Sequence, residues 1–116
     1  MNDNIKILKQ KVKQFRDERD WKQFHNPKNL SMALSVETSE LAEIFLWATT
    51  EESYNIANKK IEAVKEEIAD VFIYLLSLSD VLNIDLQDAV ENKLIKNCKK
   101  YPIDKAKGSC KKYTEL

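Results

Sequence analysis

Two pairs of acidic residues share one spacing, Glu37 with Glu40 and Glu67 with Asp70. Residues three and four apart lie on the same face of an α-helix, so the carboxylates of each pair project together. Both pairs border apolar positions, where neighbouring carboxylates repel each other and resist removal from water. A cation would relieve both costs, and carboxylates from two facing helices suit a hard divalent ion. The spacing therefore predicts a metal site.

The ligand types narrow the choice of metal. Di-iron sites in helical bundles use Glu-x-x-His motifs, but the one histidine, His25, does not follow a helical Glu by three residues. Zinc prefers His and Cys ligands. Mg²⁺ or Mn²⁺ fits four carboxylates best, and Mg²⁺ commonly holds a substrate phosphate as well. We therefore expect a phosphate-bearing ligand.

Lys93, Asn97 and Tyr101 follow one another at four-residue steps and so share a helix face. A lysine can meet a phosphate as a point charge, and the amide and the phenol can donate hydrogen bonds. The same pattern also fits an ordinary hydrated helix face. On residue types alone, both interpretations stay open.

Aromatic residues lie near the expected helix ends, at Trp21, Phe24, Trp47 and Tyr74. Taken singly, each is more often part of a core or an interface than a platform for a base. The nearby His25 is more often a cap or a structural hydrogen-bonding group than a catalyst.

Four helices must position these groups. The first runs to about Asp20 from a cap at Asn2 or Asp3, and its apolar stripe is Ile5, Leu8, Val12 and Phe15. We expect its Lys, Gln, Arg and Asp side chains to face water. The second runs from Pro27 to about Ala48, with Asn26 as its cap.

The third helix, Lys59 to Leu82, has the strongest pattern, because a wide apolar face predicts deep burial. That face comprises Val64, Ile68, Val71, Phe72, Leu75, Leu76 and Leu78. The fourth helix runs from Leu86 to about Lys100, and residues 103–116 have no periodicity and predict an extended tail. Residues 53–58 fit a short helix or a loop. An antiparallel arrangement of the second and third helices would bring the acidic pairs together.

Composition sets the broad class. One Gly and two Pro in 116 residues favour long helices in a single domain, 1–116, and 43% hydrophobic with 33% charged residues fits a folded chain. The net charge of +0 gives no sign of nucleic-acid binding. Cys98 and Cys110 match no disulfide framework, the N-terminus lacks signal-peptide features, and no apolar run reaches membrane length. We therefore expect a cytoplasmic protein with no membrane partner.

With its paired acidic motifs, the chain resembles the all-α nucleoside triphosphate pyrophosphohydrolases of the MazG type, and within them the dCTP pyrophosphatase branch. The likeness extends to Arg19-Asp20-Trp21, Phe24–Leu30, Glu66–Val71, Tyr101-Pro102 and Lys112–Leu116.

The resemblance implies a four-helix bundle-like protomer that forms homodimers or homotetramers with sites at subunit interfaces. It also implies Mg²⁺-dependent cleavage of a nucleoside triphosphate to the monophosphate and pyrophosphate, with a dCTP-like triphosphate as the expected substrate. In that family the residues matching Glu37, Glu40, Glu67 and Asp70 bind the metal and carry catalysis. Those matching Lys93, Asn97 and Tyr101 contact phosphate and sugar, and those matching Trp21, His25, Trp47 and Tyr74 build the nucleotide pocket.

Two other classes of function stay open. In a non-catalytic helical oligomerisation module, the acids would only be hydrated. A nucleotide sensor would bind the triphosphate without cutting it.

Overall fold

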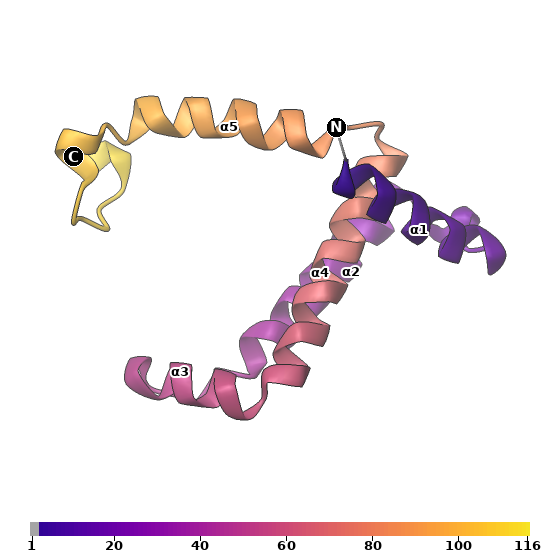
Figure 1. Ribbon diagram of the computed structural model, residues 1–116, viewed down its shortest axis with the longest axis horizontal. Helices are drawn as coiled ribbons and strands as arrows, with labels where there is room; N and C mark the ends of the chain where they lie inside the picture. Colours follow the sequence, from indigo (N-terminus) through magenta and orange to yellow (C-terminus); the bar gives the residue numbers. More distant parts are fainter. Residues whose placement is uncertain (1–2) are drawn as a thin grey trace. The chain divides into compact units, whose positions relative to one another are not determined.

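The computed structural model describes residues 3–116, which are helical with no strand among them (Figure 1). The predicted all-α class is therefore confirmed. The described residues form two compact units, one ending at Ile84 and the other comprising Asp85–Leu116. No helix in this part of the chain has the length and apolar content needed to cross a membrane.

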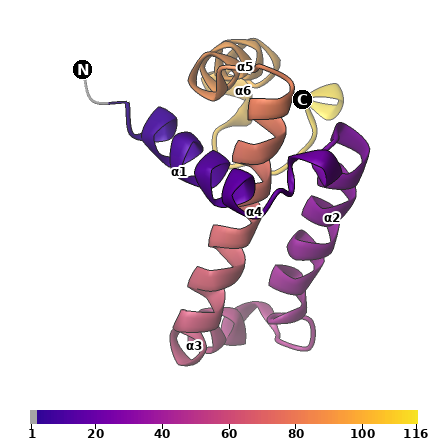
Figure 2. The same cartoon turned by 90° about the vertical axis from the view of Figure 1, so that its right-hand side faces the viewer.

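The first unit is built on an antiparallel pair of helices. Its elements in chain order are α1 (Asn4–Glu18), the 3-10 turn η1 (Lys22–Phe24), α2 (Pro27–Glu43), α3 (Thr50–Lys59) and α4 (Ile61–Val81). Helix α2 packs along α4, α3 joins them at one end, and α1 crosses α4 near the other end (Figure 2). This confirms the antiparallel arrangement that the acidic pairs require.

Helix α1 begins as expected, since the side chain of Asp3 accepts a hydrogen bond from the backbone N–H of Lys6 at 3.0 Å. The alternative cap, Asn2, lies outside the described residues. Helix α2 also begins as predicted, because the side chain of Asn26 accepts from the N–H of Asn29 at 2.9 Å and Pro27 occupies the first turn.

The predicted end of α2 near Ala48 is wrong. The helix ends at Glu43, and the chain turns through residues 44–47 before the next helix. The cause is local, because Thr49 and Glu52 form a capping box that starts α3. Residues 53–58, which fitted either a helix or a loop, belong to this helix.

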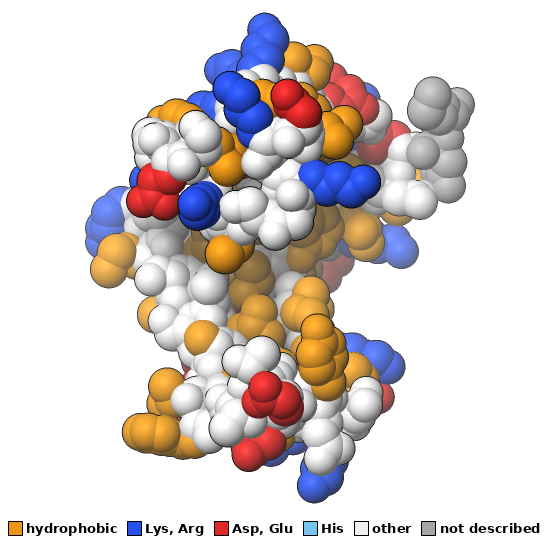
Figure 3. All heavy atoms as spheres, turned by 90° about the vertical axis from the view of Figure 1, so that its left-hand side faces the viewer, with side chains coloured by type: hydrophobic (Ala, Val, Ile, Leu, Met, Phe, Trp, Pro, Cys, Tyr) orange, Lys and Arg blue, Asp and Glu red, His pale blue; other side chains and the backbone are white. Residues whose placement is uncertain are grey.

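Burial on α4 is less complete than its apolar face predicts. Leu76 and Val64 are buried, as is Leu30 of α2. The expectation is wrong for Ile68, Phe72 and Leu75, which are 53%, 38% and 36% exposed. The elements of this unit leave that side of α4 uncovered. Hydrophobic side chains accordingly reach the surface seen in Figure 3.

Arg16 overturns a second expectation. We expected the polar side of α1 to face water, yet this residue is only 3% exposed. Its guanidinium pairs with Asp17 at 2.8 Å and with Asp80 of α4 at 3.2 Å. The two carboxylates provide partners that make burial of the charge tolerable.

The second unit contains α5 (Leu86–Lys100), α6 (Ile103–Ala106) and the 3-10 turn η2 (Tyr113–Glu115). Helix α5 has the predicted bounds, and Asp85 caps it by accepting from the N–H of Asp88 at 3.1 Å. The tail is not uniformly extended, since α6 and η2 form within it. Tyr113 packs edge-on against Tyr101, with ring centroids 6.0 Å apart, so the tail folds back on the end of α5.

The packing of α2 against α4 makes a testable prediction. Replacing Leu76, which is 2% exposed, with Ala should lower the free energy of unfolding by about 2 to 5 kcal/mol, through lost apolar burial and the cavity left behind. Leu46→Ala is the matched control, because Leu46 is 61% exposed. Urea unfolding followed by circular dichroism measures both. Equal losses in the two variants would contradict the assigned core.

Candidate metal centre and adjoining pocket

The antiparallel packing of α2 on α4 gathers carboxylates from both helices. Glu37 of α2 and Glu67 and Asp70 of α4 each offer an oxygen, and these oxygens all lie within 4.8 Å of one another. We call these three residues the acidic cluster. Glu40 lies one helical turn from Glu37 and close enough for its charge to act on Glu37 and Glu67. The sequence-predicted acids therefore come together as the spacing required.

Two oxygens of the acidic cluster are cut off from water. Oε2 of Glu37 and Oε2 of Glu67 are buried and have no hydrogen-bond partner among the described residues. A buried, unpartnered carboxylate oxygen is costly, and hydrated surface acids do not show this feature. These oxygens need a proton or a cation.

The pKa values in and around the acidic cluster also reflect the burial and crowding of its carboxylates. Burial, followed by the hydrogen-bonding interaction with Glu40 and then its charge, raises the pKa of Glu37 from 4.5 to about 7. Burial and the charge of Glu40 also raise the pKa of Glu67 above its ordinary value. Burial and then the charge of Glu37 raise the pKa of the Tyr74 phenol. Burial and the neighbouring carboxylates thus favour the protonated form of Glu37.

The donor set fits a metal ion. The acidic cluster offers carboxylate oxygens and no imidazole or thiol, which is the ligand chemistry of hard divalent cations. A cation there would provide a partner for both orphaned oxygens and offset the repulsion that raises the pKa values. The acidic cluster can therefore bind a metal ion.

A cavity of about 380 Å³ adjoins the acidic cluster, with Glu37 and Asp70 in its wall. Three of the sequence-predicted pocket residues, Trp21, His25 and Tyr74, line the same cavity. The remaining lining residues are Lys11, Val12, Phe15, Arg16, Ile73 and Ser77. Acidic and aromatic groups from α1, α2, α4 and the α1–α2 connection thus meet around one space.

The aromatic wall of this cavity is centred on Trp21. Its ring packs edge-on against Phe15 at 5.8 Å and lies tilted to His25 at 6.3 Å. Trp21 remains 43% exposed, so part of its surface is available to a ligand. Nδ1 of His25 is buried without a hydrogen-bond partner in the described chain. Burial, and then the charge of Arg16, lower the pKa of His25, which favours the neutral imidazole.

The other predicted site residues do not line this cavity. Trp47 lies in the turn after α2 and is 91% exposed. Lys93, Asn97 and Tyr101 lie on α5 and at its C-terminal end, in the second unit. Tyr101 donates its backbone N–H to the carbonyl of Asn97 at 2.8 Å, which closes the last turn of the helix. Their roles in binding stay predictions.

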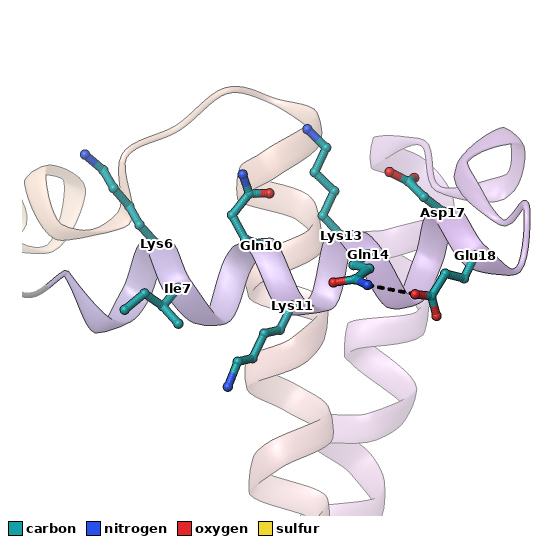
Figure 4. A pocket seen from close by; sticks show the side chains of 8 residues that line it. All are labelled: Lys6, Ile7, Gln10, Lys11, Lys13, Gln14, Asp17 and Glu18. Carbon is teal, nitrogen blue, oxygen red and sulfur yellow. Dashed lines mark hydrogen bonds between the residues drawn. The ribbon is translucent and has the colours of Figure 1, made fainter.

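A second hollow lies along α1 alone (Figure 4). Its lining runs from Lys6 to Glu18, and Lys6 and Lys13 extend away from the helix in this view while Lys11 points to the other side. Gln14 donates to Glu18 at 2.8 Å across it. Among residues 3–116 no second element contributes a wall, so the polar groups of this hollow do not converge as a ligand site requires.

Lys11 and Arg16 are lining residues that our sequence analysis missed, because it assigned them to a hydrated helix side. A signal for Arg16 was present in the spacing. This residue follows Val12 by four positions and so continues the apolar stripe of α1. A charged residue within such a stripe indicates a buried partner, which the structure identifies as Asp80.

The family of the chain follows from its similarity to known proteins. Residues 32–116 match the MazG-like family, and the chain belongs to that family. It is 44% identical to the dCTP pyrophosphatase 1 of Mus musculus and to that of Homo sapiens, over 105 residues. The match covers 89% of this chain but 62% of each relative, so the chain spans about three-fifths of their length.

A solved structure is also similar. A pyrophosphatase from Archaeoglobus fulgidus superposes with a TM-score of 0.85 at 42% sequence identity. The superposition covers 88% of this chain and 95% of that one. The helical architecture is therefore shared with an experimentally determined protein.

The raised pKa of Glu37 predicts a stability effect in metal-free protein. In the unfolded chain this carboxyl titrates near 4.5, so between that pH and about 7 the folded state holds its proton more tightly. Folding stability from this group therefore falls as pH rises through that window. In EDTA, Glu37→Gln should melt at a higher temperature than wild type at about pH 8, and the difference should shrink towards about pH 5.

Adding Mg²⁺ should then raise the melting temperature of wild type. In Glu37→Gln, most of this increase should be lost. Glu62→Gln is the control on the α4 helix, since the Glu62 side chain is 81% exposed. Differential scanning fluorimetry measures all three proteins. An equal Mg²⁺ response in Glu37→Gln and wild type would remove Glu37 from the metal site.

Proposed function

We propose that the protein is a Mg²⁺-dependent nucleoside triphosphate pyrophosphohydrolase, with Mn²⁺ as a substitute metal. The observation that carries this proposal is the acidic cluster with its orphaned carboxylate oxygens, set in the wall of a cavity that also has an aromatic side. The names of the similar proteins, a pyrophosphatase and dCTP pyrophosphatase 1, support the same reaction and a dCTP-like substrate.

Glu37, Glu67, Asp70 and Glu40 would hold the metal, which when bound neutralises triphosphate charge and lowers the pKa of water. In the reaction, a water oxygen forms a bond to the α-phosphorus and the bond from that phosphorus to the bridging oxygen breaks. Pyrophosphate leaves with the bridging oxygen. If Glu37 or Glu40 binds the metal through one carboxylate oxygen, its second oxygen would accept the proton of the attacking water. Such chemistry needs positioning and electrostatics rather than a nucleophilic side chain.

Trp21, His25 and Tyr74 would bind the base and sugar. The exposed part of Trp21 offers a π surface for stacking, and Nδ1 of His25 is a polar atom still lacking a partner. Lys93 and Asn97, with Tyr101, would contact phosphate and sugar. Their proposed role rests on residue type and on the family resemblance.

We further propose that the active form is a homodimer or homotetramer of four-helix bundle-like protomers. Apolar side chains that their own unit leaves uncovered support this. Among them are Ile68 and Phe72 on α4 and Val90 and Leu94 on α5, which are 38% to 56% exposed. Exposed apolar surface of this kind marks an interface. Trp47, at 91% exposure, would then meet a nucleotide across such an interface.

The reaction can be tested directly. Purified protein incubated with Mg²⁺ and each common deoxynucleoside triphosphate should release monophosphate and pyrophosphate, most readily from dCTP. Asp70→Asn and Glu40→Gln should each lower kcat at least about a hundredfold while the helical circular dichroism is kept. Glu62→Gln, on the exposed side of α4, should stay near wild type. If the triphosphate protects the protein but no product forms, the protein is a nucleotide sensor. If there is neither protection nor product, it is an oligomerisation module.

The role of Trp47 has its own test. If its indole stacks on the base, Trp47→Ala should raise KM more than it lowers kcat, because stacking acts in the ground state and the transition state alike. A loss of about 1 to 3 kcal/mol in stacking corresponds to roughly 5-fold to 150-fold in KM. Steady-state kinetics with the preferred triphosphate measures this. An unchanged KM would exclude Trp47 from substrate binding.

A further inference from the structure

Arg16 is buried although it is charged. It is 3% exposed, whereas the side chains of its partners Asp17 and Asp80 are 47% and 24% exposed. An ion pair of this kind is weak evidence for stability, because desolvating the cation offsets much of the attraction. The position of the charge therefore calls for another explanation.

The side chain of Arg16 fastens α1 to α4. Its Nε donates to Oδ1 of Asp17 at 2.9 Å, and its Nη1 donates to Oδ2 of Asp80 at 3.2 Å. Asp80 lies on α4, the helix that carries Glu67 and Asp70. The guanidinium thus has one carboxylate partner on its own helix and one on the helix of the acidic cluster.

The backbone of Arg16 fixes the segment that follows α1. Its carbonyl accepts hydrogen bonds from the N–H of Arg19 at 3.2 Å and of Trp21 at 3.0 Å. Asp20 has a φ of +54°, a left-handed conformation that reverses the chain just before Trp21. Trp21 then packs edge-on against Phe15. One residue therefore ties both α4 and Trp21 to the end of α1.

We propose that Arg16 is a positioning residue that, through Asp80, holds Trp21 at a set place relative to the acidic cluster. Arg16 lines the cavity together with Trp21, Glu37 and Asp70, so a shift of α1 on α4 would change the shape of that cavity. The consequence is a determinant of substrate affinity that is separate from the metal ligands. The inference rests on the proposed function, because the affinity concerned is that for a nucleoside triphosphate.

The chain provides a matched control. Nζ of Lys9 donates to the carbonyl of Ile84 at 2.9 Å, which is a second polar tie from α1 to the end of α4. Lys9 is not among the residues that line the cavity. Lys9→Met therefore removes a contact between α1 and the end of α4 without touching the wall that holds Trp21.

The test compares Arg16→Met, Arg16→Lys, Asp80→Asn and Lys9→Met in the full chain with Mg²⁺ and dCTP. Arg16→Met should raise KM about tenfold with kcat within about twofold, since positioning is lost and the metal ligands remain. Arg16→Lys should recover part of the affinity, and Lys9→Met should retain the wild-type KM. Asp80→Asn should also raise KM, because it weakens the same contact. This variant can still test the proposal if Arg16→Met does not fold.

Fluorescence gives a readout that does not depend on turnover. In a Trp47→Phe background the emission comes from Trp21, and both Arg16→Met and Asp80→Asn should shift it to the red and increase its quenching by acrylamide. An unchanged emission together with an unchanged KM in the folded variants, or an equal KM rise in Lys9→Met, would overturn the positioning role. If wild type releases no pyrophosphate from any triphosphate, the proposed function fails instead, and the Trp21 emission still decides the role of Arg16.

Discussion

The central constraint on this structure is that packing of α2 on α4 brings negatively charged carboxylates close together. The packing of α2 on α4 places carboxylates from both helices within 4.8 Å of one another, and Leu30 of α2 and Leu76 of α4 are both buried. Nothing in the described residues hydrogen-bonds the buried oxygens of Glu37 and Glu67, so the apolar contacts must offset their repulsion. Because the metal-free fold already keeps these repelling carboxylates together, a cation could bind there without a rearrangement of the helices. The raised pKa of Glu37 has the same cause, because burial and the neighbouring carboxylates disfavour its charged form.

Local chemistry explains why much of the fold could be predicted. Helix starts followed from capping residues such as Asn26 and Asp85, whose side chains bond the first free N–H groups wherever the helix lies. The acidic cluster was predictable for a related reason, since a three-residue spacing fixes a shared helix face regardless of tertiary structure. Only the antiparallel arrangement of α2 and α4 had to be added, and short connections between helices favour it.

The predictions of helix ends and of burial were wrong where tertiary contacts or competing local signals determine the structure. The capping box at Thr49 ends the second helix earlier than its apolar pattern suggested. Arg16 looked hydrated because its partner Asp80 lies 64 residues away, and no sequence window shows that pair. Ile68 looked buried because periodicity reports which face is apolar but not what covers it. The contribution of Lys11 to the cavity likewise follows only from how α1 crosses α4.

The two sides of the cavity are built differently, and in the proposed enzyme this would separate metal binding from ligand recognition. The acidic cluster stands on the regular faces of α2 and α4, where helical geometry fixes the side chains. Trp21 and His25 instead stand on the irregular connection after α1, which is held by the hydrogen bonds of Arg16 and by the caps around Asn26. A change in that connection can reshape the aromatic wall while the carboxylates keep their places. If the proposed function holds, such a division would let one helical frame keep its metal site while its preference for a base changes.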